Sequence, residues 1–428
     1  MDINLNFIKK IVQTNLFKIA SLNSLSVILK LGIGLITSKV MAIFVGPSGL
    51  ALIGNFRNFV GFLETISTLG FQNGIVKYIA ETKKKELELK RYVSTVCISV
   101  ASVSMVLSCF LFFFSSYWNT VIFGSSSDYS FVFKIFALAL PWYAFSLVLV
   151  AIINGLERFK NVIYINIIGN CIGLLVSVGF IYCYQTLGAL LATIITPSLL
   201  FIVSFYYINK EFLLLGLIRF EFFQFKIIKK LSDYFLMAFF SGMVSSLVFL
   251  AIRKNIITTL GIQQAGYWEA MTRISSYYLL FFSSILTLYF LPKLAVSKSN
   301  QETKKVFWSY YINILPFLIL GLLLLYFSRF FIIKILLTKD FLPVTTLFFW
   351  QLLGDLFKMA SWILGYQFFA KKLTLAFIIS ELFSLGLLYF LSNYLITVFG
   401  TQGIVMAQAI DNSIYLLVLV FYFRKSLF

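Results

Sequence analysis

The chain has 428 residues, of which 60% are hydrophobic and only 12% are charged, and its mean hydropathy is +0.94. A soluble domain is about half apolar and about one quarter charged, so this composition excludes an ordinary soluble protein and indicates an integral membrane protein. The 35 lysines and arginines outnumber the 16 acids. No basic run lies in a soluble segment long enough to fold, which argues against nucleic-acid binding. The lack of histidine excludes histidine-ligated metal sites and histidine acid–base chemistry.

Twelve stretches of the chain are long and apolar enough to cross a membrane, for which a helix needs about 20 residues. In chain order they cover residues 16–44, 48–80, 92–115, 129–154, 161–184, 187–208, 231–257, 264–290, 306–328, 343–369, 374–395 and 402–423. Lys9 and Lys10 precede them without a short apolar core and a small-residue cleavage site, so we expect no removed signal peptide. The four cysteines fall inside apolar spans and are interpreted as small core residues rather than disulfides or ligands. The sequence therefore predicts an all-α polytopic membrane protein.

Basic residues occupy alternate connections between these spans. They lie in connections 83–91, 157–160, 209–230, 292–305 and 371–372 and at 424–425, whereas connections 45–49, 116–128, 184–188, 259–266 and 395–401 contain no lysine or arginine. Only connection 329–342 breaks the alternation. Because connections rich in lysine and arginine stay in the cytoplasm, both termini are predicted to be cytoplasmic, which requires an even number of spans.

The longest basic connection, residues 209–230, separates six predicted spans from six. A weak repeat supports this division, since GPSGLALIGNFRN (46–58) and AGYWEAMTRISS (265–276) each place an arginine shortly after a glycine, Arg57 and Arg273 respectively. Two six-helix bundles around a central cleft are a recurrent plan of transporters. We therefore predict an N-terminal bundle over 1–208, a cytoplasmic linker over 209–230 and a C-terminal bundle over 231–428.

Cations in the first two predicted spans are candidates for a substrate path. A charge inside a bilayer costs a few kcal/mol or more, so it usually faces protein or a water-filled cavity. Lys30 lies near mid-depth, where it cannot easily reach the surface, whereas Lys39 is closer to the outer face. Arg57 and Glu64 are seven residues apart and share one helix face. Arg57 is expected either to meet an anion in a cleft or to form an ion pair that only packs the bundle.

The seventh and eighth predicted spans carry a second group of charges. Arg253 and Lys254 are adjacent, so they point about 100° apart on a helix and cannot both face one narrow groove. We expect one of them to line the cleft and leave open that both reach the outer interface. Glu269 and Arg273 have the i,i+4 spacing of a local salt bridge. Arg273 is also a candidate partner of Arg57 for substrate.

The tenth predicted span has a polar stripe formed by Gln351, Asp355 and Lys358, at i, i+4 and i+7. Asp355 either neutralises Lys358 or serves as a carboxylate that binds a coupling ion. The many aromatic residues are interpreted as packing and lipid contact. Trp268 and Trp350 are the exceptions, as candidate platforms for stacking against a sugar.

Single acids in the last two predicted spans, Glu381 and Asp411, either balance a basic neighbour or bind a coupling ion. For coupling to H⁺ or Na⁺, Asp355 and Glu64 are the candidates that we favour. No cofactor and no metal site are expected.

Five segments resemble the bacterial Wzx polysaccharide flippases, and within them the branch that moves lipid III of enterobacterial common antigen. These segments are KLGIGLITSKVMAIFVGPSGLALIGNFRNF (30–59), GIVKYIAE (74–81), GYWEAMTRISSYYL (266–279), YFLPKL (289–294) and WQLLGDLFKMASWILGY (350–366). The resemblance covers nearly the whole chain in order, and the NFR and WQLLGD segments are its specific parts. Residues 301–345 show little of the pattern beyond hydropathy. O-antigen flippases share the same plan, so the resemblance leaves the glycan open.

The resemblance implies a member of the multidrug/oligosaccharidyl-lipid/polysaccharide exporter superfamily, with two six-helix bundles in a V around a central cationic cavity. It implies transport of an undecaprenyl-pyrophosphate-linked oligosaccharide from the cytoplasmic to the periplasmic leaflet of the bacterial inner membrane. Candidate partners are that glycan lipid, membrane lipids, a polysaccharide polymerase and a chain-length regulator, with no nucleic acid. The implied substrate-binding residues are Lys30, Arg57, Lys254 and Lys358, together with Asp355.

Three alternatives remain. A cation-coupled multidrug exporter of the same superfamily would favour acids in its cleft, and the surplus of internal bases argues against it. A polymerase or a lipid-dependent glycosyltransferase would need a reactive constellation, commonly on a large outer loop, and the outer connections here are short, so we expect no enzyme. The third alternative is a structural role in a polysaccharide assembly complex. Only a flipping assay can distinguish that role from transport.

Overall fold

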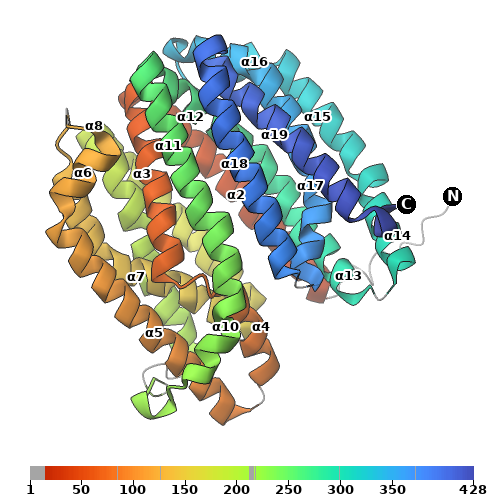
Figure 1. Ribbon diagram of the computed structural model, residues 1–428. Coiled ribbons are helices and arrows are strands. Elements are labelled where there is room, and N and C mark those ends of the chain that lie inside the picture. The colour runs from red at the N-terminus through yellow and green to blue at the C-terminus, as the bar shows by residue number, and fades with distance from the viewer. Residues whose placement is uncertain are drawn as a thin grey trace. The chain divides into compact units, whose positions relative to one another are not determined.

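The computed structural model (Figure 1) describes residues 15–83, 85–125, 127–211, 216, 218–297, 299–371 and 373–428. Residues 1–14, on which the signal-peptide expectation depends, lie outside the described residues. The same holds for residues 212–215 and 217 of the predicted linker. Within the described ranges the regular structure consists of α-helices with short 3₁₀ and π segments and contains no strand. This confirms the prediction of an all-α protein.

The N-terminal helices are α2 (Asn15–Phe44), α3 (Gly46–Ser67), α4 (Gln72–Thr82), α5 (Glu86–Phe113), α6 (Ser115–Phe123), α7 (Ser130–Gly155) and α8 (Phe159–Glu211). The middle of the chain forms η1 (Phe220–Phe222), α10 (Phe225–Ala238), η2 (Phe239–Val244), α11 (Ser245–Leu260), α12 (Ile262–Ile285), η3 (Leu286–Phe290) and α13 (Leu291–Val296). The remaining elements are α14 (Asn300–Asn313), α15 (Leu315–Phe327), α16 (Arg329–Leu336), η4 (Lys339–Leu347), α17 (Phe348–Lys371), α18 (Thr374–Phe399), α19 (Thr401–Tyr422) and α20 (Arg424–Leu427).

Nine helical stretches of the described chain are long and apolar enough to cross a membrane. The longest, Phe159–Lys210, is interrupted at Gln185, whose backbone is not helical (φ 49°, ψ −120°), so its length allows two crossings. Helices α3 and α12 are not among the nine, because their charged and polar side chains lower their hydropathy. Large apolar side chains such as Leu175 (75% exposed) and Phe390 (72% exposed) cover the outside, as a lipid environment requires. The chain is a multi-pass helical membrane protein, and the count of twelve spans stays a prediction.

Contacts between residues group the chain into two compact units. Unit 1 contains residues 1–37 and 64–235, and unit 2 contains residues 38–63 and 236–428. The segment 38–63 therefore belongs with unit 2, although it precedes most of unit 1 in the sequence. The division into an N-terminal bundle (1–208) and a C-terminal bundle (231–428) remains a prediction.

The core of unit 1 is formed mainly by α4, α5, α7 and α8. Val148 and Ile152 of α7 pack with Val96 of α5 in one buried cluster. Gly155 has no room for a side chain, because a Cβ atom there would lie 2.7 Å from the Cβ of Ile79, so α4 and α7 lie in close contact.

The cysteines all belong to unit 1, but only one of them is a core residue. Cys97 is buried, which confirms the expectation for that residue. Cys109, Cys171 and Cys183 are exposed, so the expectation that all four are core residues is wrong for these three. They lie on helix faces that carry exposed apolar side chains, where a small thiol is compatible with lipid.

The core of unit 2 centres on α17. Tyr310 and Tyr311 of α14 donate hydrogen bonds to the carbonyl oxygens of Met359 (3.0 Å) and Ala360 (2.9 Å) in α17. Helix α19 approaches α17 closely at Gly354, where a Cβ atom would lie 3.1 Å from the Cα of Ala409. These contacts hold α17, which carries the predicted polar stripe, at the centre of the unit.

Candidate functional site

Three arginines of unit 2 converge on one buried carboxylate. Arg253 Nη2 donates to Glu269 Oε2 over 2.7 Å, Arg57 Nη2 lies 3.1 Å from Glu269 Oε1, and Arg273 Nε donates to the same oxygen over 3.3 Å. The side chains of Glu269 and Arg253 are 0% and 1% exposed, whereas that of Arg57 is 39% exposed. We call Arg57, Arg253, Glu269 and Arg273 the arginine cluster. Arg57 forms its accessible edge.

The cluster depends on close approach between α3, α11 and α12. Gly54 lies three residues before Arg57, and a Cβ atom there would come within 2.5 Å of Glu269 Oε2. Gly266 lies three residues before Glu269, and a Cβ atom there would come within 1.9 Å of the Pro47 carbonyl oxygen. Glycine at both positions lets the α3 segment reach α12. This explains why residues 38–63 group with unit 2.

Trp268 supports the guanidinium of Arg253 from one side. The centre of that guanidinium lies 4.9 Å from the indole ring, and Phe249 stacks on the same ring at 5.8 Å. A cation over an aromatic face is attracted by the quadrupole of the ring. Trp268, one of the two candidate sugar platforms, is fully buried in this stack, so its ring contacts protein rather than an open site.

The cluster has more positive than negative charge. Three guanidinium groups surround a single carboxylate, and no hydrogen-bond partner is found among the described residues for Nε and Nη1 of Arg253. A buried donor without a partner is costly. The excess charge would attract an anion with several oxygen atoms to the accessible edge at Arg57.

Replacing Gly54 by alanine is expected to destabilise the protein by about 1–3 kcal/mol, the usual cost of overpacking. The added methyl group would lie 2.5 Å from Glu269 Oε2 and 2.7 Å from Arg253 Cζ, so the cluster would have to shift. The shift in unfolding midpoint of the purified protein measures this effect. Gly365→Ala in α17, where a Cβ atom meets nothing within 4 Å, is the matched control. Equal midpoints for both variants would contradict the packing argument.

The structure joins three of the predicted site residues and places two others elsewhere. Arg57, Arg253 and Arg273 meet in the cluster, and the predicted Glu269–Arg273 pair is formed. Lys254 is exposed, as expected for a residue about 100° from Arg253 on the same helix. Lys30 is an exposed residue of unit 1 and is not part of the cluster.

Glu64 makes a different contact from the one that its spacing to Arg57 suggests. Tyr143 Oη of α7 donates to Glu64 Oε2 over 2.5 Å, and both residues belong to unit 1.

Lys39 forms hydrogen bonds at the end of another helix. Its Nζ donates to the carbonyl oxygens of Lys334 (3.2 Å) and Leu337 (2.5 Å). Lys334 lies in the last turn of α16 and Leu337 directly follows that helix, so Lys39 caps its C-terminal end.

A second polar group surrounds the buried carboxylate of Asp355 in α17. Ser275 Oγ donates to Asp355 Oδ2 over 2.6 Å, Tyr278 Oη donates to the same oxygen, and Gln351 Nε2 lies 3.2 Å from it. The predicted stripe therefore exists, but Asp355 is satisfied by hydroxyls of α12. Lys358, one turn further on, is half-buried with its Nζ 6.0 Å from the ring of Trp362.

The remaining predicted or weighed residues lie nearby on the last helices. Trp350 is half-buried beside Phe349, with 5.2 Å between ring centres. Ser384 Oγ donates to Asp411 over 3.0 Å, and Tyr415 Oη donates to Glu381 over 3.2 Å. Each of these acids thus has a hydroxyl donor on the neighbouring helix of the α18–α19 pair. Sequence reasoning missed these hydroxyl partners, because serine and tyrosine in an apolar span carry no spacing signal.

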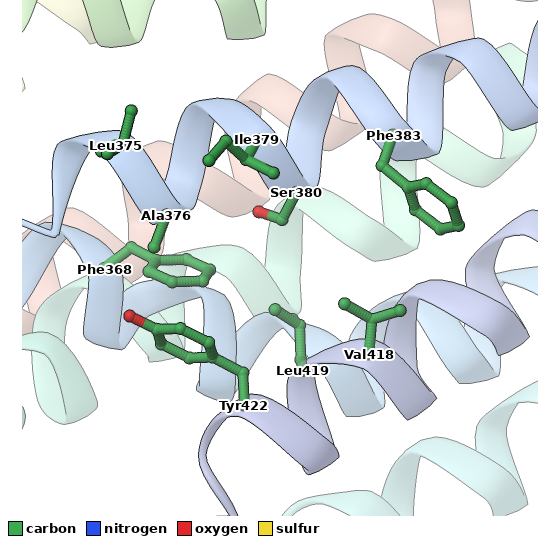
Figure 2. Close-up of a pocket in the computed structure, with 9 residues that line it drawn as sticks. All are labelled: Phe368, Leu375, Ala376, Ile379, Ser380, Phe383, Val418, Leu419 and Tyr422. Carbon is green, nitrogen blue, oxygen red and sulfur yellow. The ribbon is translucent and has the colours of Figure 1, made fainter.

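An apolar groove of about 420 Å³ lies between α17, α18 and α19 (Figure 2). Phe368 and Tyr422 form one end of it, and Phe383 and Val418 form the other. Its one serine, Ser380, donates to the carbonyl oxygen of Phe377 in its own helix. The described lining of the groove therefore offers hydrocarbon contacts and no charged group, which makes it unsuited to a polar head group.

Comparisons with known proteins identify a family and a fold. Residues 16–295 match the model of the family described as polysaccharide biosynthesis protein. The lipid III flippases of Escherichia coli (strain K12) and Shigella flexneri are each 26% identical to this chain over 395 residues, which cover 91% of this chain and 94% of theirs.

Two solved structures have folds similar to that of this chain. The lipid II flippase MurJ in an inward closed conformation has a TM-score of 0.72 at 18% identity, covering 95% of this chain and 87% of that one. An inward-facing multidrug resistance MATE family transporter of the MOP superfamily has a TM-score of 0.71 at 16% identity, covering 93% and 97%. At these identities the likeness establishes the fold alone. The family match and the two lipid III flippase relatives confirm the predicted resemblance to polysaccharide flippases.

Proposed function

The chain belongs to the polysaccharide biosynthesis protein family, and from that membership we propose that it flips an undecaprenyl-pyrophosphate-linked oligosaccharide across the bacterial inner membrane. The 26% identity to two lipid III flippases over 91% of the chain supports this substrate class. The single observation that carries the proposal on the structural side is the arginine cluster, with its excess positive charge and its exposed edge at Arg57.

The physical problem for such a flippase is the polar head of its substrate. The polyprenyl tail matches the bilayer and can stay in lipid, whereas a pyrophosphate and its sugars must cross about 30 Å of hydrocarbon. Removing water from a charged group without replacement is prohibitive. Two unit charges 4 Å apart attract by about 4 kcal/mol at an effective dielectric constant of 20, so two or three cations offset much of this cost.

Arginine suits this task better than lysine. Its planar guanidinium presents a fork of donors that pairs with two phosphate oxygens at once. In the proposed cycle Arg57 receives the pyrophosphate first because it is the accessible member of the cluster, and Arg253 and Arg273 add charge behind it. Lys30, Lys254 and Lys358 are proposed as further cations along the path, with Trp350 and Gln351 as contacts for the sugars.

The proposed architecture places twelve spans in two six-helix bundles, residues 1–208 and 231–428, joined by a cytoplasmic linker at 209–230. The bundles form a V around a cationic cavity, and both termini are cytoplasmic. Alternation of basic connections and the likeness in fold to MurJ and MATE transporters support this arrangement. Proposed partners are membrane lipids and, within an assembly complex, a polysaccharide polymerase and a chain-length regulator.

The function is tested by reconstitution and by genetics. Purified protein in liposomes is expected to move a fluorescent undecaprenyl-pyrophosphate oligosaccharide between leaflets, and its gene is expected to restore surface glycan in a strain without its lipid III flippase. Empty liposomes and a MATE transporter are the controls. A protein that inserts and folds but moves no such lipid would refute the proposal.

A cation-coupled multidrug exporter is the second candidate, favoured by the TM-score of 0.71 to a MATE transporter. Its substrates are often cations, which the excess positive charge of the arginine cluster would repel. Transport of cationic dyes by the same liposomes distinguishes the two candidates.

We propose that H⁺ or Na⁺ drives transport through Asp355, with Glu64 as a second candidate. Asp355 is buried and holds its hydroxyl donors in a fixed geometry. Asp355→Asn keeps the shape but removes the charge, so we expect slow flipping that no longer responds to an imposed H⁺ or Na⁺ gradient. Asp340→Asn, at an exposed acid of η4, is the matched control. A gradient response that survives in Asp355→Asn would exclude this residue.

A further inference from the structure

Unit 1 contains a polar pocket of about 220 Å³ at the beginning of α5 and α10. Its charged lining residues are Glu88, Arg91, Lys226 and Lys230. Glu88 already pairs with Lys85, whose Nζ donates to its carboxylate over 3.1 Å. Glu88 is the one acid of the described lining, and because Lys85 pairs with it, the charges of Arg91, Lys226 and Lys230 leave the pocket with an excess of positive charge.

The local sequence builds this pocket on a rigid support. Lys226 and Lys230 have i,i+4 spacing on α10, so they lie on one face, while Ile227 and Leu231 are buried in the core of unit 1. A Cβ atom at Gly74 would lie 2.6 Å from a methyl carbon of Leu231, which shows how closely α10 packs on α4.

The segment before α10 is tied to α5 as well. The backbone N–H of Arg219 donates to Ser94 Oγ over 3.3 Å, and that of Gln224 donates to Thr95 Oγ1 over 3.0 Å. Two walls of the pocket are thereby fixed to each other. The packing of α5 and α10 therefore sets the backbone positions from which the lining cations extend.

Exposed aromatic side chains mark the level of this pocket relative to the bilayer. Phe220, Phe223 and Phe225 are 83%, 37% and 73% exposed, next to the lysines of α10. Such a pattern of apolar rings beside basic residues is typical of a segment that lies in the head-group region. The connections 83–91 and 209–230 are the ones that the distribution of basic residues predicts to be cytoplasmic.

We propose that this pocket binds the phosphate head group of an anionic phospholipid of the cytoplasmic leaflet. Basic pockets between membrane helices on the cytoplasmic side suit such head groups. The three cations neutralise the phosphate, and the phenylalanines contact the upper part of the acyl chains. A soluble acidic protein segment would leave these rings in water, so a lipid fits the surroundings better.

The test is a titration of delipidated protein with dioleoyl-phosphatidylglycerol, followed by native mass spectrometry. The pocket variant is Arg91→Gln/Lys226→Gln/Lys230→Gln. The control variant Lys210→Gln/Arg219→Gln/Lys229→Gln removes the same charge from exposed cations that do not line the pocket. We expect the pocket variant to bind about 100-fold more weakly, since each of its three cations contacts the head group and contributes roughly fivefold. The control is expected to change by about threefold or less, because its cations lie outside the pocket and do not contact the head group.

Two further titrations complete the design. Dioleoyl-phosphatidylcholine, a neutral lipid, is expected to bind all variants equally, and undecaprenyl diphosphate shows whether the pocket serves the flipped lipid instead. The single variant Lys226→Gln, with an expected loss of about fivefold, replaces the triple variant if that one fails to fold. Equal losses in the pocket and control variants, or a loss confined to undecaprenyl diphosphate, would overturn the proposal. These outcomes do not depend on whether the protein flips its substrate.

Discussion

Replacing Glu269 by glutamine is expected to destabilise the protein by about 3–5 kcal/mol, the cost of breaking a buried ion pair by removing one partner. Glu269 is the carboxylate that all three arginines of the cluster contact. Without it, the buried guanidinium of Arg253 would lose its salt bridge, and three positive charges would repel one another. The unfolding midpoint of the purified protein measures the loss.

A matched control and a second variant sharpen this prediction. Glu221→Gln, at an exposed position on η1, removes the same charge from the surface and should leave the midpoint unchanged. The double variant Glu269→Leu/Arg253→Met replaces the buried pair with apolar groups and should recover much of the lost stability. A midpoint for Glu269→Gln that equals that of the wild type would mean that the cluster contributes nothing to the fold.

Replacing Arg57 by alanine is expected to slow flipping by about tenfold or more while the protein still inserts and folds. Arg57 is 39% exposed, so its loss costs less stability than the loss of a buried member. It is also the member of the cluster that a pyrophosphate would reach first. Hydrogen bonds to charged groups contribute about 1.5–3 kcal/mol each, which corresponds to a tenfold or larger loss of transport. Initial rates in the liposome assay measure it.

The conservative variant Arg57→Lys distinguishes charge from geometry. Arginine can keep one nitrogen on Glu269 and present others to phosphate, whereas lysine has a single nitrogen. We therefore expect Arg57→Lys to fold normally and to flip at least about tenfold more slowly. Arg424→Lys, at an exposed position near the C-terminus, is the control. Normal surface glycan in a strain that carries only Arg57→Ala would contradict the role of this residue.

The fold class was predictable because it follows from local properties. Twenty-residue apolar runs and the placement of basic residues are read directly from neighbouring positions, and they predicted an all-helical polytopic protein. The break at Gln185 fell within a connection that the charge pattern already indicated. The sequence did not predict turns and helix ends that lie inside a span. Helix α3 ends at Ser67, within the predicted span 48–80, and Leu69 and Gly70 just after it have positive φ angles.

The site was predictable only in part, since its partners lie far apart in the chain. The i,i+4 pair of Glu269 and Arg273 follows from spacing, but the approach of Arg57, 212 residues away, does not. The same holds for Tyr278, which is 77 residues from Asp355, and for Lys39, which is 298 residues from Leu337. Charge in an apolar span identifies a residue that needs a partner, but only the packing of helices decides which partner it finds.

The placement of the cysteines has a practical consequence for spectroscopy. All four native thiols belong to unit 1, and unit 2 has none. Once Cys109, Cys171 and Cys183 are replaced by alanine, the buried Cys97 is the one native thiol that remains. A spin label on a cysteine introduced in unit 2 would then give its signal without a contribution from labelled native thiols. If one of the exposed thiols, Cys109, Cys171 or Cys183, is kept instead, a label there and a second label in unit 2 would record the distance between units during turnover.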